Sequence, residues 1–438
     1  MGVMTDRGTL RRAVQEWRKW FLRITETALP RTLSVRRTKG LALALTGVRR
    51  SGKTFASVLL SRADPERTFY FNFEDPIALA VTSPEFIDEL IDLHEESAGI
   101  APTHVVLDEI QQVPNWERWV RKAVDLERYQ LTITGSSSRL LSSELATAIA
   151  GRVIEQQVWP LSFAEYIEFT GAPAASDAQQ RKQLQRYLKW GGFPRVALLG
   201  DELERILLLK QYLQDIVLRD VINRHQLRDN HALERLVAWY LTKVSCLHSY
   251  QAIRKAFGGS VESIAAYTAY LTEAFLAFEV QRYHPNLKVQ ARDAKKIYLI
   301  DNGLRTVSLA SDREDWGRLA ENVVYLELRR RGEEVFYFKG TQETDFLVTH
   351  LGKPHQAIQV AYSDLRDEHT HAREVGALLE CLRETKLPRG MILTSTLEDR
   401  IHVEKRQIDF LPLHQWLLSG KSSKTKAKGR MTDREGLA

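Results

Sequence analysis

The first part of the chain alternates continuously apolar runs with longer segments in which apolar residues recur every three or four positions. Apolar runs lie at 41–47, 68–75, 103–109 and 131–137, and helical patterns separate them. Continuous apolar strands that alternate with helices are typical of a parallel sheet buried on both faces. We therefore predict an α/β domain in this part of the chain.

Residues 10–28 precede the first strand and follow a different pattern. Arginine and lysine alternate there with apolar residues at helical spacing, namely Leu10, Val14, Trp17, Phe21 and Ile24. This pattern predicts an amphipathic basic helix that packs on the following domain.

The second part begins with long helical patterns from about 175 to 245. A short helix, a Gly-Gly-Ser turn, a longer helix and two strands around a turn follow up to residue 310, and this order predicts a winged helix-turn-helix. Residues 318–418 then predict a helix, three strands, a helix, a strand and a closing helix. The composition after 419 is typical of a flexible tail.

A chain of 438 residues is long enough for about three domains. We divide it into a basic N-terminal helix and linker (1–40), an α/β core (41–170), a helical lid (171–235), a winged helix (236–310), a second α/β domain (311–418) and a basic flexible tail (419–438).

The charge is spread unevenly. The chain carries 62 Lys and Arg against 56 Asp and Glu, a net charge of +6. Residues 1–40 hold ten basic and three acidic residues, and 419–438 hold six and two, so the middle of the chain is net acidic. Basic ends suit a polyanionic partner such as nucleic acid, although solvated arms that keep a protein soluble have the same composition.

Cysteine content and hydropathy exclude other classes of protein. Cys246 and Cys381 are far apart and belong to no metal-binding motif, so we expect neither a disulfide framework nor a zinc site. The longest apolar runs fall well short of the ~20 residues that a membrane span requires, and the N-terminus lacks the apolar segment of a secretory signal. We expect a cytoplasmic protein without a membrane partner.

Candidate chemistry begins at the end of the first strand, where residues 47–54 read GVRRSGKT. A GxxxxGK[ST] motif between a strand and a helix turns backbone N–H groups and the helix N-terminus toward phosphate. We expect Lys53 to reach the β- and γ-phosphates of ATP and the Thr54 hydroxyl to ligate Mg²⁺. The nucleotide-binding residues are then Gly47, Arg50, Ser51, Gly52, Lys53 and Thr54. Whether Arg50 and its neighbour Arg49 face phosphate or a neighbouring subunit stays open.

An acidic pair follows at the end of the third strand. The run VVLDE at 105–109 ends in Asp108 and Glu109. We expect Asp108 to hold Mg²⁺ through water and Glu109 to orient and activate the attacking water. A second acid beside the first favours ATP hydrolysis over nucleotide binding alone.

Two more residues receive catalytic roles. The next strand ends in TGSSS at 134–138, where we take Ser136 as the group that contacts the γ-phosphate or the attacking water, with an ordinary polar turn as the alternative. Arg152 lies on a Gly-bounded turn, and we predict that it serves a neighbouring subunit as an arginine finger. A plain surface arginine is the alternative.

Six segments form a set in order and spacing, namely GVRRSGKT, FNFED at 71–75, VVLDEIQQVPNWE at 105–117, TGSSSRLLSSELATAIAGRV at 134–153, WPLSFAEY at 159–166 and KWGGFPRV at 189–196. Together they resemble the AAA+-related (AAA_14-type) ATPases that carry a C-terminal DUF4143 region, over about residues 15–418. The resemblance implies a RecA-like ASCE P-loop core at 41–170 and a homo-oligomer, expected as a hexameric ring. It also implies the roles given above for the P-loop, the acidic pair, a Ser or Thr in 134–138 and Arg152.

The order of elements in 318–418 resembles the PD-(D/E)xK nuclease core, in which an Asp on the second strand and an ExK on the third assemble a metal site. Asp345 stands where the Asp of the second strand is expected. On the third strand, Gln359 stands in place of the acid and Ala361 in place of the lysine. Two acids of the preceding helix could add a metal ligand, namely Glu321 and Glu327, yet no substitute lysine is apparent. We expect a nuclease-like domain that does not cleave, with Asp345 in a structural role.

The longer helix of the winged helix carries Glu262 and Glu273 and no Lys or Arg, which argues against base reading in a DNA groove. Phosphate contacts would come from basic residues around it, namely Arg254, Lys255, Lys288, Arg292, Lys295 and Lys296. An architectural winged helix is the alternative.

Two functions are consistent with these features. In the first, an ATP-hydrolysing oligomer binds and remodels DNA or translocates on it, with branched or Holliday-junction DNA as the favoured substrate. In the second, the protein is a nucleotide-dependent protein-interaction switch in a defence or toxin–antitoxin setting. The basic ends favour the first function, and the helix without Lys or Arg favours the second. Gln359 and Ala361 disfavour an ATP-powered nuclease.

Overall fold

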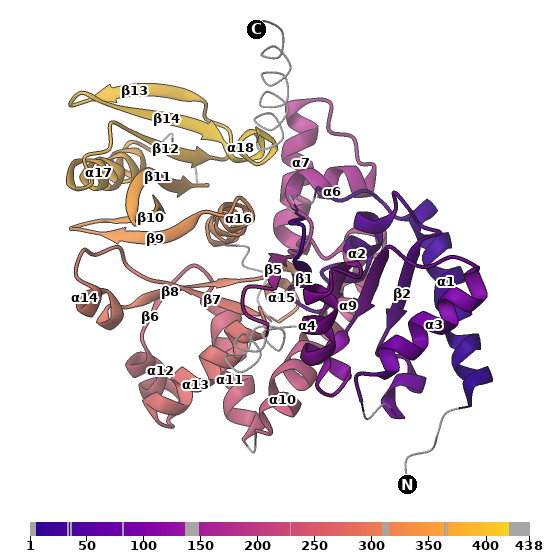
Figure 1. Cartoon of the computed structure of the whole chain (residues 1–438). Coiled ribbons are helices and arrows are strands. Elements are labelled where there is room, and N and C mark those ends of the chain that lie inside the picture. Colours follow the sequence, from indigo (N-terminus) through magenta and orange to yellow (C-terminus); the bar gives the residue numbers. More distant parts are fainter. Residues whose placement is uncertain are drawn as a thin grey trace, which may run out of the picture. The chain divides into compact units, whose positions relative to one another are not determined.

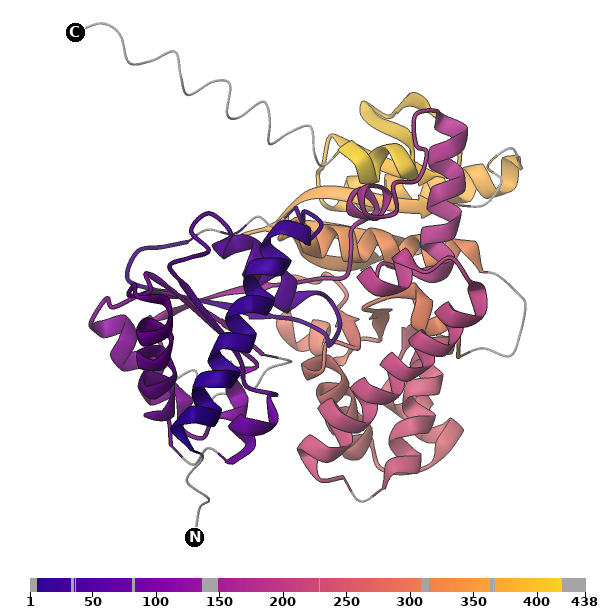
Figure 2. The same ribbon diagram turned by 90° about the vertical axis from the view of Figure 1, so that its right-hand side faces the viewer.

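The computed structural model describes residues 6–32, 35, 37–80, 83–135, 149–227, 229–308, 315–362, 365 and 367–419. The chain separates into two compact units. Unit 1 comprises Met1–Trp159 with Glu273–Phe275, and unit 2 comprises Pro160–Thr272 with Leu276–Ala438. Figures 1 and 2 show the elements of each unit from two sides. No helix in the described part of the chain is long and apolar enough to cross a membrane.

Unit 1 is built on a five-stranded sheet in the order β2-β3-β4-β1-β5. Its strands are β1 (Ala42–Thr46), β2 (Thr68–Asn72), β3 (His104–Asp108), β4 (Gln130–Thr134) and β5 (Val153–Gln157). All neighbours are parallel, as the apolar runs predict. The sequence pattern did not reveal β5, whose residues VIEQQ lack the continuous apolar character of the other four strands.

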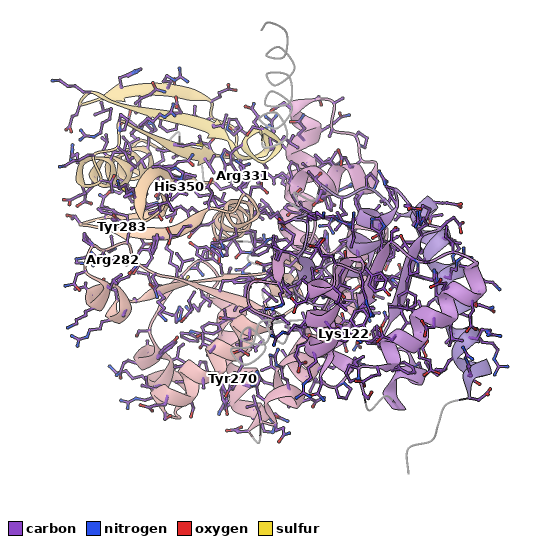
Figure 3. All side chains as sticks on the ribbon, in the orientation of Figure 1. Lys122, Tyr270, Arg282, Tyr283, Arg331 and His350 are labelled. Atoms are coloured by element: carbon purple, nitrogen blue, oxygen red, sulfur yellow. The ribbon has the colours of Figure 1, made fainter. Side chains whose placement is uncertain are left out.

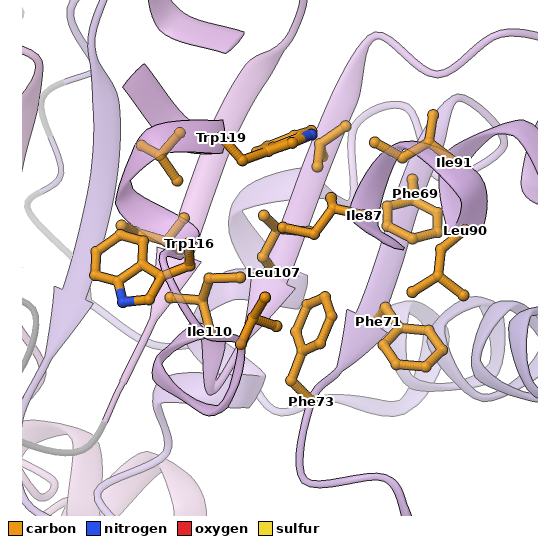
Figure 4. Close-up of a cluster of buried hydrophobic side chains, with 14 of the residues drawn as sticks. Phe69, Phe71, Phe73, Ile87, Leu90, Ile91, Leu107, Ile110, Trp116 and Trp119 are labelled. Carbon is orange, nitrogen blue, oxygen red and sulfur yellow. The ribbon is translucent and has the colours of Figure 1, made fainter. Parts of the chain in front are cut away.

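Helices cover the sheet, and short 3-10 turns follow two strands. They are α1 (Arg7–Thr27), α2 (Lys53–Ser61), α3 (Phe86–Ala98), α4 (Trp116–Asp125), η1 (Pro76–Ala80) and η2 (Ile110–Gln112). Figure 4 shows one side of the resulting core, where Phe69, Phe71 and Leu107 of the sheet meet Ile87 of α3 and Trp119 of α4. This packing fixes the strand ends that carry the candidate chemistry.

The N-terminal helix α1 packs on unit 1, as its amphipathic pattern predicts. Most of its buried residues join the core of the sheet and α3. Its basic face binds acids of the same unit, because Arg7 and Arg11 each lie 2.5 Å from a carboxylate oxygen of Glu96 and Arg18 pairs with Glu66. These arginines are therefore engaged within unit 1, which weakens their interpretation as a nucleic-acid-binding arm.

Unit 2 begins with a run of helices. They are α6 (Phe163–Thr170), α7 (Asp177–Trp190), α8 (Pro194–Leu198), α9 (Glu202–Asp215), a π-helical segment η4 (Ile216–Ile222), α10 (Asn223–His225) and α11 (Asn230–Thr242). Capping boxes at Ser162 and Ser176 start the first two helices.

A three-stranded antiparallel sheet follows in the order β6-β8-β7. Its strands are β6 (Leu247–His248), β7 (Ala277–Val280) and β8 (Lys295–Leu299), with helices α12 (Tyr250–Phe257), α13 (Val261–Glu273), α14 (Leu287–Arg292) and α15 (Asn302–Thr306). Helix α14 lies between β7 and β8, so these strands are not joined by the simple turn that we expected of a wing.

The last part of unit 2 contains a six-stranded sheet in the order β13-β14-β12-β11-β10-β9. The strands are β9 (Glu334–Lys339), β10 (Glu343–His350), β11 (Lys353–Ala361), β12 (Arg389–Thr394), β13 (Asp399–Val403) and β14 (Arg406–Pro412), with helices α16 (Trp316–Arg330), α17 (Glu368–Glu384) and α18 (Leu413–Ser419). The order from α16 to β12 is the predicted one, and the hairpin of β13 and β14 was not predicted.

A short segment after β7 joins the two sheets of unit 2. Tyr283 N donates to Tyr337 O of β9 at 2.8 Å, and Tyr337 N donates to Gln281 O at 3.1 Å. Between them, an Arg282 guanidinium N–H donates to Asp293 at 3.0 Å. Figure 3 marks Arg282 and Tyr283 beside β9. This link places the end of β7 beside β9, the edge strand of the larger sheet.

Candidate nucleotide site

The loop between β1 and α2 has the backbone that its glycines permit. Gly47 has φ +142°, and a Cβ on it would lie 2.3 Å from Val158 O. Gly52 has φ +98° and directly precedes the first residue of α2. Side chains at these two positions would be strained or would clash, so the loop requires glycine. The N–H groups at the start of α2 remain available to an anion.

Lys53 and Ser51 of this loop are buried. The Lys53 ammonium donates to Gly47 O at 3.1 Å and to Val48 O at 3.3 Å, so it lies folded back on the loop. The Ser51 hydroxyl has no hydrogen-bond partner among the described residues. Arg31 supports the loop from behind by donating to Ser51 O at 3.0 Å and to Trp159 O at 2.9 Å. A buried ammonium and an unpartnered hydroxyl fit a phosphate-binding loop.

Asp108 ends β3 at the same edge of the sheet and is fully buried. Its Oδ2 accepts from Thr54 Oγ1 at 2.8 Å, from Tyr70 OH at 2.8 Å and from Asn72 Nδ2 at 3.0 Å. Its Oδ1 accepts from Thr134 Oγ1 at 2.5 Å. The two residues that sequence analysis assigned to the metal, Thr54 and Asp108, are thus in direct contact.

The carboxyl group of Asp108 has an unusual protonation equilibrium. Burial, followed by the charge of neighbouring Glu109, raises its pKa to about 6, and the hydrogen bonds from Thr134, Tyr70 and Thr54 oppose this rise. A cation held at this carboxylate would favour its ionised form. Asp108 and Glu109 bring two acidic groups close together, and a bound metal ion would neutralise part of their charge. The residues therefore suit a metal ion.

Glu109 lies next to Asp108 in a left-handed backbone conformation, with φ 54°. Such a backbone is uncommon for a non-glycine residue, and it clusters at functional sites. The Glu109 N–H donates to Thr134 Oγ1 at 3.1 Å, and its carboxylate accepts from Gln111 Nε2 at 2.5 Å. The acid is mostly buried beside the P-loop, where it could contact a water at the γ-phosphate.

Ser136, our predicted γ-phosphate contact, lies outside the described residues. Thr134, two residues earlier at the end of β4, bridges the acidic pair, because its hydroxyl donates to Asp108 and accepts from Glu109 N. A Ser or Thr was expected in 134–138, but the sequence did not distinguish these positions from one another.

Arg152 is not part of this strand edge. Its carbonyl accepts from Ala42 N at 2.8 Å, so it lies where β1 begins, whereas the P-loop follows the last residue of β1. A five-residue strand separates the two ends by about 15 Å. The Arg152 guanidinium pairs with Asp125 through two contacts of 2.7 and 3.3 Å. Any role at a phosphate would therefore be at another subunit's site.

The two arginines within the P-loop differ from each other. Arg49 donates to Glu74 at 3.2 Å and is mostly buried. Arg50 is exposed, with φ 69°. The question whether a P-loop arginine faces phosphate or a neighbouring subunit therefore concerns Arg50.

Sequence reasoning did not identify three residues that shape this site, namely Arg31, Tyr70 and Asn72, and it gave Thr134 only as one of the positions in 134–138. Tyr70 and Asn72 alternate on β2 and reach Asp108 because β2 lies beside β3. Their alternation along the strand was a usable signal, since it places both on one face of the sheet. Trp20 and Phe21 of α1 stack on the Tyr70 ring, with centroid distances of 5.0 and 5.7 Å.

The candidate phosphate contacts of unit 2 divide into two groups. Arg254, Lys255, Lys288 and Arg292 are exposed. Lys295 pairs with Glu279 at 2.7 Å, and Lys296 is buried among acids. The expectation that Lys296 contacts DNA is therefore wrong, because a polyanion cannot reach its ammonium without disrupting the core.

Asp345 lies on β10, as the second strand of the predicted order requires. Its Oδ2 accepts from Val360 N at 3.0 Å, and its N–H donates to Gln359 Oε1 at 3.1 Å. Ala361 is buried. A lysine does reach Asp345, because Lys296 of β8 donates to its Oδ1 at 2.8 Å. The sequence analysis did not identify this lysine.

Comparison with known proteins identifies a domain and a family. A family model described as an AAA domain matches residues 39–167. Residues 181–315 match a domain of unknown function, DUF8612, in the region where we expected DUF4143. The comparisons thus support the P-loop domain and a further domain of unassigned function.

Two relatives match most of the chain. The uncharacterized protein MJ1544 of Methanocaldococcus jannaschii is 32% identical over 398 residues, which cover 85% of this chain and 87% of the relative. An uncharacterized protein of Haemophilus influenzae is 30% identical over 345 residues, which cover 75% and 83%. Among solved structures, C. elegans PCH-2 matches 44% of this chain and 49% of its own with 15% identity and a TM-score of 0.22, too small a likeness to indicate a shared fold.

Proposed function

We propose that this chain, which belongs to the same protein family as MJ1544 and carries an AAA domain, hydrolyses ATP with Mg²⁺ at the P-loop of unit 1. One observation carries the proposal, the 2.8 Å hydrogen bond between Thr54 Oγ1 and Asp108 Oδ2. P-loop ATPases place these two groups around their metal ion.

Phosphate binding falls to the loop and the first turn of α2. Backbone N–H groups and the helix N-terminus supply positive potential, and the buried Lys53 ammonium adds a full charge. Lys53 donates to two loop carbonyls, which it would exchange for the β- and γ-phosphate oxygens of ATP. Bound Mg²⁺ would neutralise charge that develops on the phosphates, with Thr54 and Asp108 as its holders.

Water activation falls to Glu109. Its carboxylate lies beside Asp108, and its backbone is fixed through Thr134. A carboxylate in this position orients a water and accepts its proton as the oxygen attacks. Thr134 holds both acids at once, so it positions the metal-binding group and the base relative to each other.

The first test compares ATP binding and phosphate release in the wild type and in Lys53→Ala. We expect the variant to lose nucleotide affinity by at least tenfold and to release no phosphate above background. Lys39→Ala, which changes an exposed lysine of the same unit, serves as the control. Wild-type ATP affinity in the Lys53 variant would contradict the proposal.

We further propose that hydrolysis acts on DNA, with branched DNA as the favoured form. Support comes from four exposed cations of unit 2, which α12 and α14 carry, namely Arg254, Lys255, Lys288 and Arg292. Such residues contact phosphates irrespective of base sequence.

Gel shifts with duplex, single-stranded and four-way DNA, repeated across salt concentrations, test this second proposal. We expect binding that falls steeply with salt and is lost when the four residues become alanine. The control changes four other exposed basic residues of unit 2, namely Lys353, Lys386, Arg389 and Lys405. If no DNA binds to the protein or stimulates its ATPase activity, the result would favour the protein-interaction switch instead.

A further inference from the structure

A lysine lies at the centre of an acidic cluster in unit 2. Lys296 of β8 has a side chain that is 2% exposed. Its ammonium lies 2.9 Å from Glu321 Oε1, 2.9 Å from Glu343 Oε1 and 2.8 Å from Asp345 Oδ1. Three carboxylates thus surround one positive charge inside the protein.

The three acids come from one helix and one strand, and hydrogen bonds hold two of them in place. Glu321 lies on α16 and also accepts from Tyr298 OH at 2.7 Å. Glu343 and Asp345 lie on β10, where the second oxygen of Asp345 accepts from Val360 N. The link between β7 and β9 brings Lys296 to them across the boundary between the two sheets of unit 2.

The electrostatics favour a charged lysine. Burial opposes the charge on Lys296, but Asp345 and Glu321 outweigh it, and the pKa of the ammonium is raised well above its ordinary value. Burial and the charge of Asp345 raise the pKa of Glu321 to about 7, against the effect of Lys296. The ionised form of Glu321 therefore depends on the ammonium.

The residues do not fit the metal centre of a PD-(D/E)xK nuclease. Gln359 takes the place of the third-strand acid, and both ends of its amide are engaged, since Oε1 accepts from Asp345 N and Nε2 donates to Glu374 at 2.6 Å. The Lys296 ammonium, which lies 2.8–2.9 Å from an oxygen of each carboxylate, also occupies the space between them that a metal ion would need.

We infer that the Lys296 ammonium is a built-in cation that occupies the position of a divalent metal ion in this cluster. The native cluster therefore binds no divalent metal. Replacing Lys296 with an uncharged residue leaves three convergent carboxylates, which are the ligands that Mg²⁺ and Mn²⁺ prefer. Such a variant should acquire a metal site that the wild type lacks.

The test counts bound Mn²⁺ by electron paramagnetic resonance in the full-length, nucleotide-free chain. We expect Lys296→Met to bind one more Mn²⁺ per chain than the wild type and to regain in MnCl₂ the Tm that it loses in EDTA. Adding Asp345→Asn to this variant should remove the extra ion. Lys353→Met, which changes an exposed lysine of β11, should behave as the wild type.

The wild-type background offers a second readout if Lys296→Met does not fold. Asp345→Asn alone should leave the number of bound Mn²⁺ ions unchanged, because the native cluster holds none. A loss of one Mn²⁺ in this variant would overturn the inference. So would a folded Lys296→Met protein that binds no additional ion. Neither outcome bears on ATP hydrolysis, which belongs to unit 1.

Discussion

The aspartate at the end of β3 owes its position to side chains from three other elements. Thr54 of α2, Tyr70 of β2 and Thr134 of β4 all donate to Asp108. Each such bond to a charged group contributes about 1.5–3 kcal/mol, but burial of the carboxylate and the charge of Glu109 outweigh these bonds, since the pKa of Asp108 stays raised. These hydrogen bonds fix the orientation of the carboxylate, so the metal-binding group is preorganised.

Tyr70→Phe removes one of these bonds while keeping the ring that α1 stacks on. We expect kcat to fall about three- to tenfold and the Mg²⁺ concentration for half-maximal activity to rise. The reason is the loss of about 1 kcal/mol from the hydrogen bond that orients Asp108. Steady-state ATPase assays across Mg²⁺ concentrations would measure both effects. Tyr129→Phe serves as the control, and an unchanged Mg²⁺ dependence would exclude a positioning role for Tyr70.

Asp301 of unit 2 is a second buried acid whose position is fixed by hydrogen bonds. It is fully buried and accepts from Gly192 N at 2.6 Å and Gly303 N at 2.8 Å, so it holds the GG turn of KWGGFPRV against α15. A Cβ on Gly191 would clash with the Asp301 carboxylate, which explains that glycine. Burial raises the pKa of Asp301 to about 7, although both amides oppose the rise.

The sign of the resulting pH effect follows from linkage. Between the ordinary pKa of about 4 and the folded value of about 7, the folded state binds more protons than the unfolded state, so stability falls as pH rises. Urea unfolding should show a steeper loss of stability from pH 4 to 7 in the wild type than in Asp301→Asn. Asp92→Asn, which changes an exposed acid, should keep the wild-type slope. Equal slopes of stability against pH in all three proteins would contradict a buried Asp301 carboxyl group with a raised pKa.

The sequence predicted those strands and turns that depend on a local pattern of residues. Continuous apolar runs identified β1 to β4, and the glycines of GVRRSGKT identified the turn into α2, because parallel strands and phosphate loops require these residues locally. Strand β5 was missed because VIEQQ has no continuous apolar run, and β5 pairs with β1 through its backbone.

Contacts between distant elements were not predictable in the same way. Tyr70 meets Asp108 only through the sheet order, and Lys296 meets Asp345 only because β8 lies against the larger sheet. Lys296 instead looked like a phosphate contact near a wing, since its sequence neighbours are basic. A charge run by itself does not distinguish a solvated lysine from a buried one.

At the scale of the whole molecule, Arg152 decides whether one chain suffices for catalysis. It lies at the strand edge opposite the P-loop and pairs with Asp125 of its own chain. We expect Arg152→Ala to lower kcat at least tenfold without weakening ATP binding, because the arginine would serve a neighbouring subunit. Mixing this variant with Lys53→Ala should restore part of the activity. An interface between the two variants would combine the intact P-loop of the Arg152 variant with the intact arginine of the Lys53 variant. No recovery on mixing would argue against a shared site.

The Glu109→Gln variant shows whether Glu109 activates water for ATP hydrolysis beside Asp108 and Lys53. ATP affinity and single-turnover hydrolysis should be measured on the same sample, with Glu89→Gln, an exposed glutamate of α3, as the control. We predict ATP affinity within about threefold of the wild type and a hydrolysis rate at least a hundredfold lower, because the amide cannot accept the proton of the attacking water. Hydrolysis at the wild-type rate in Glu109→Gln would contradict the account.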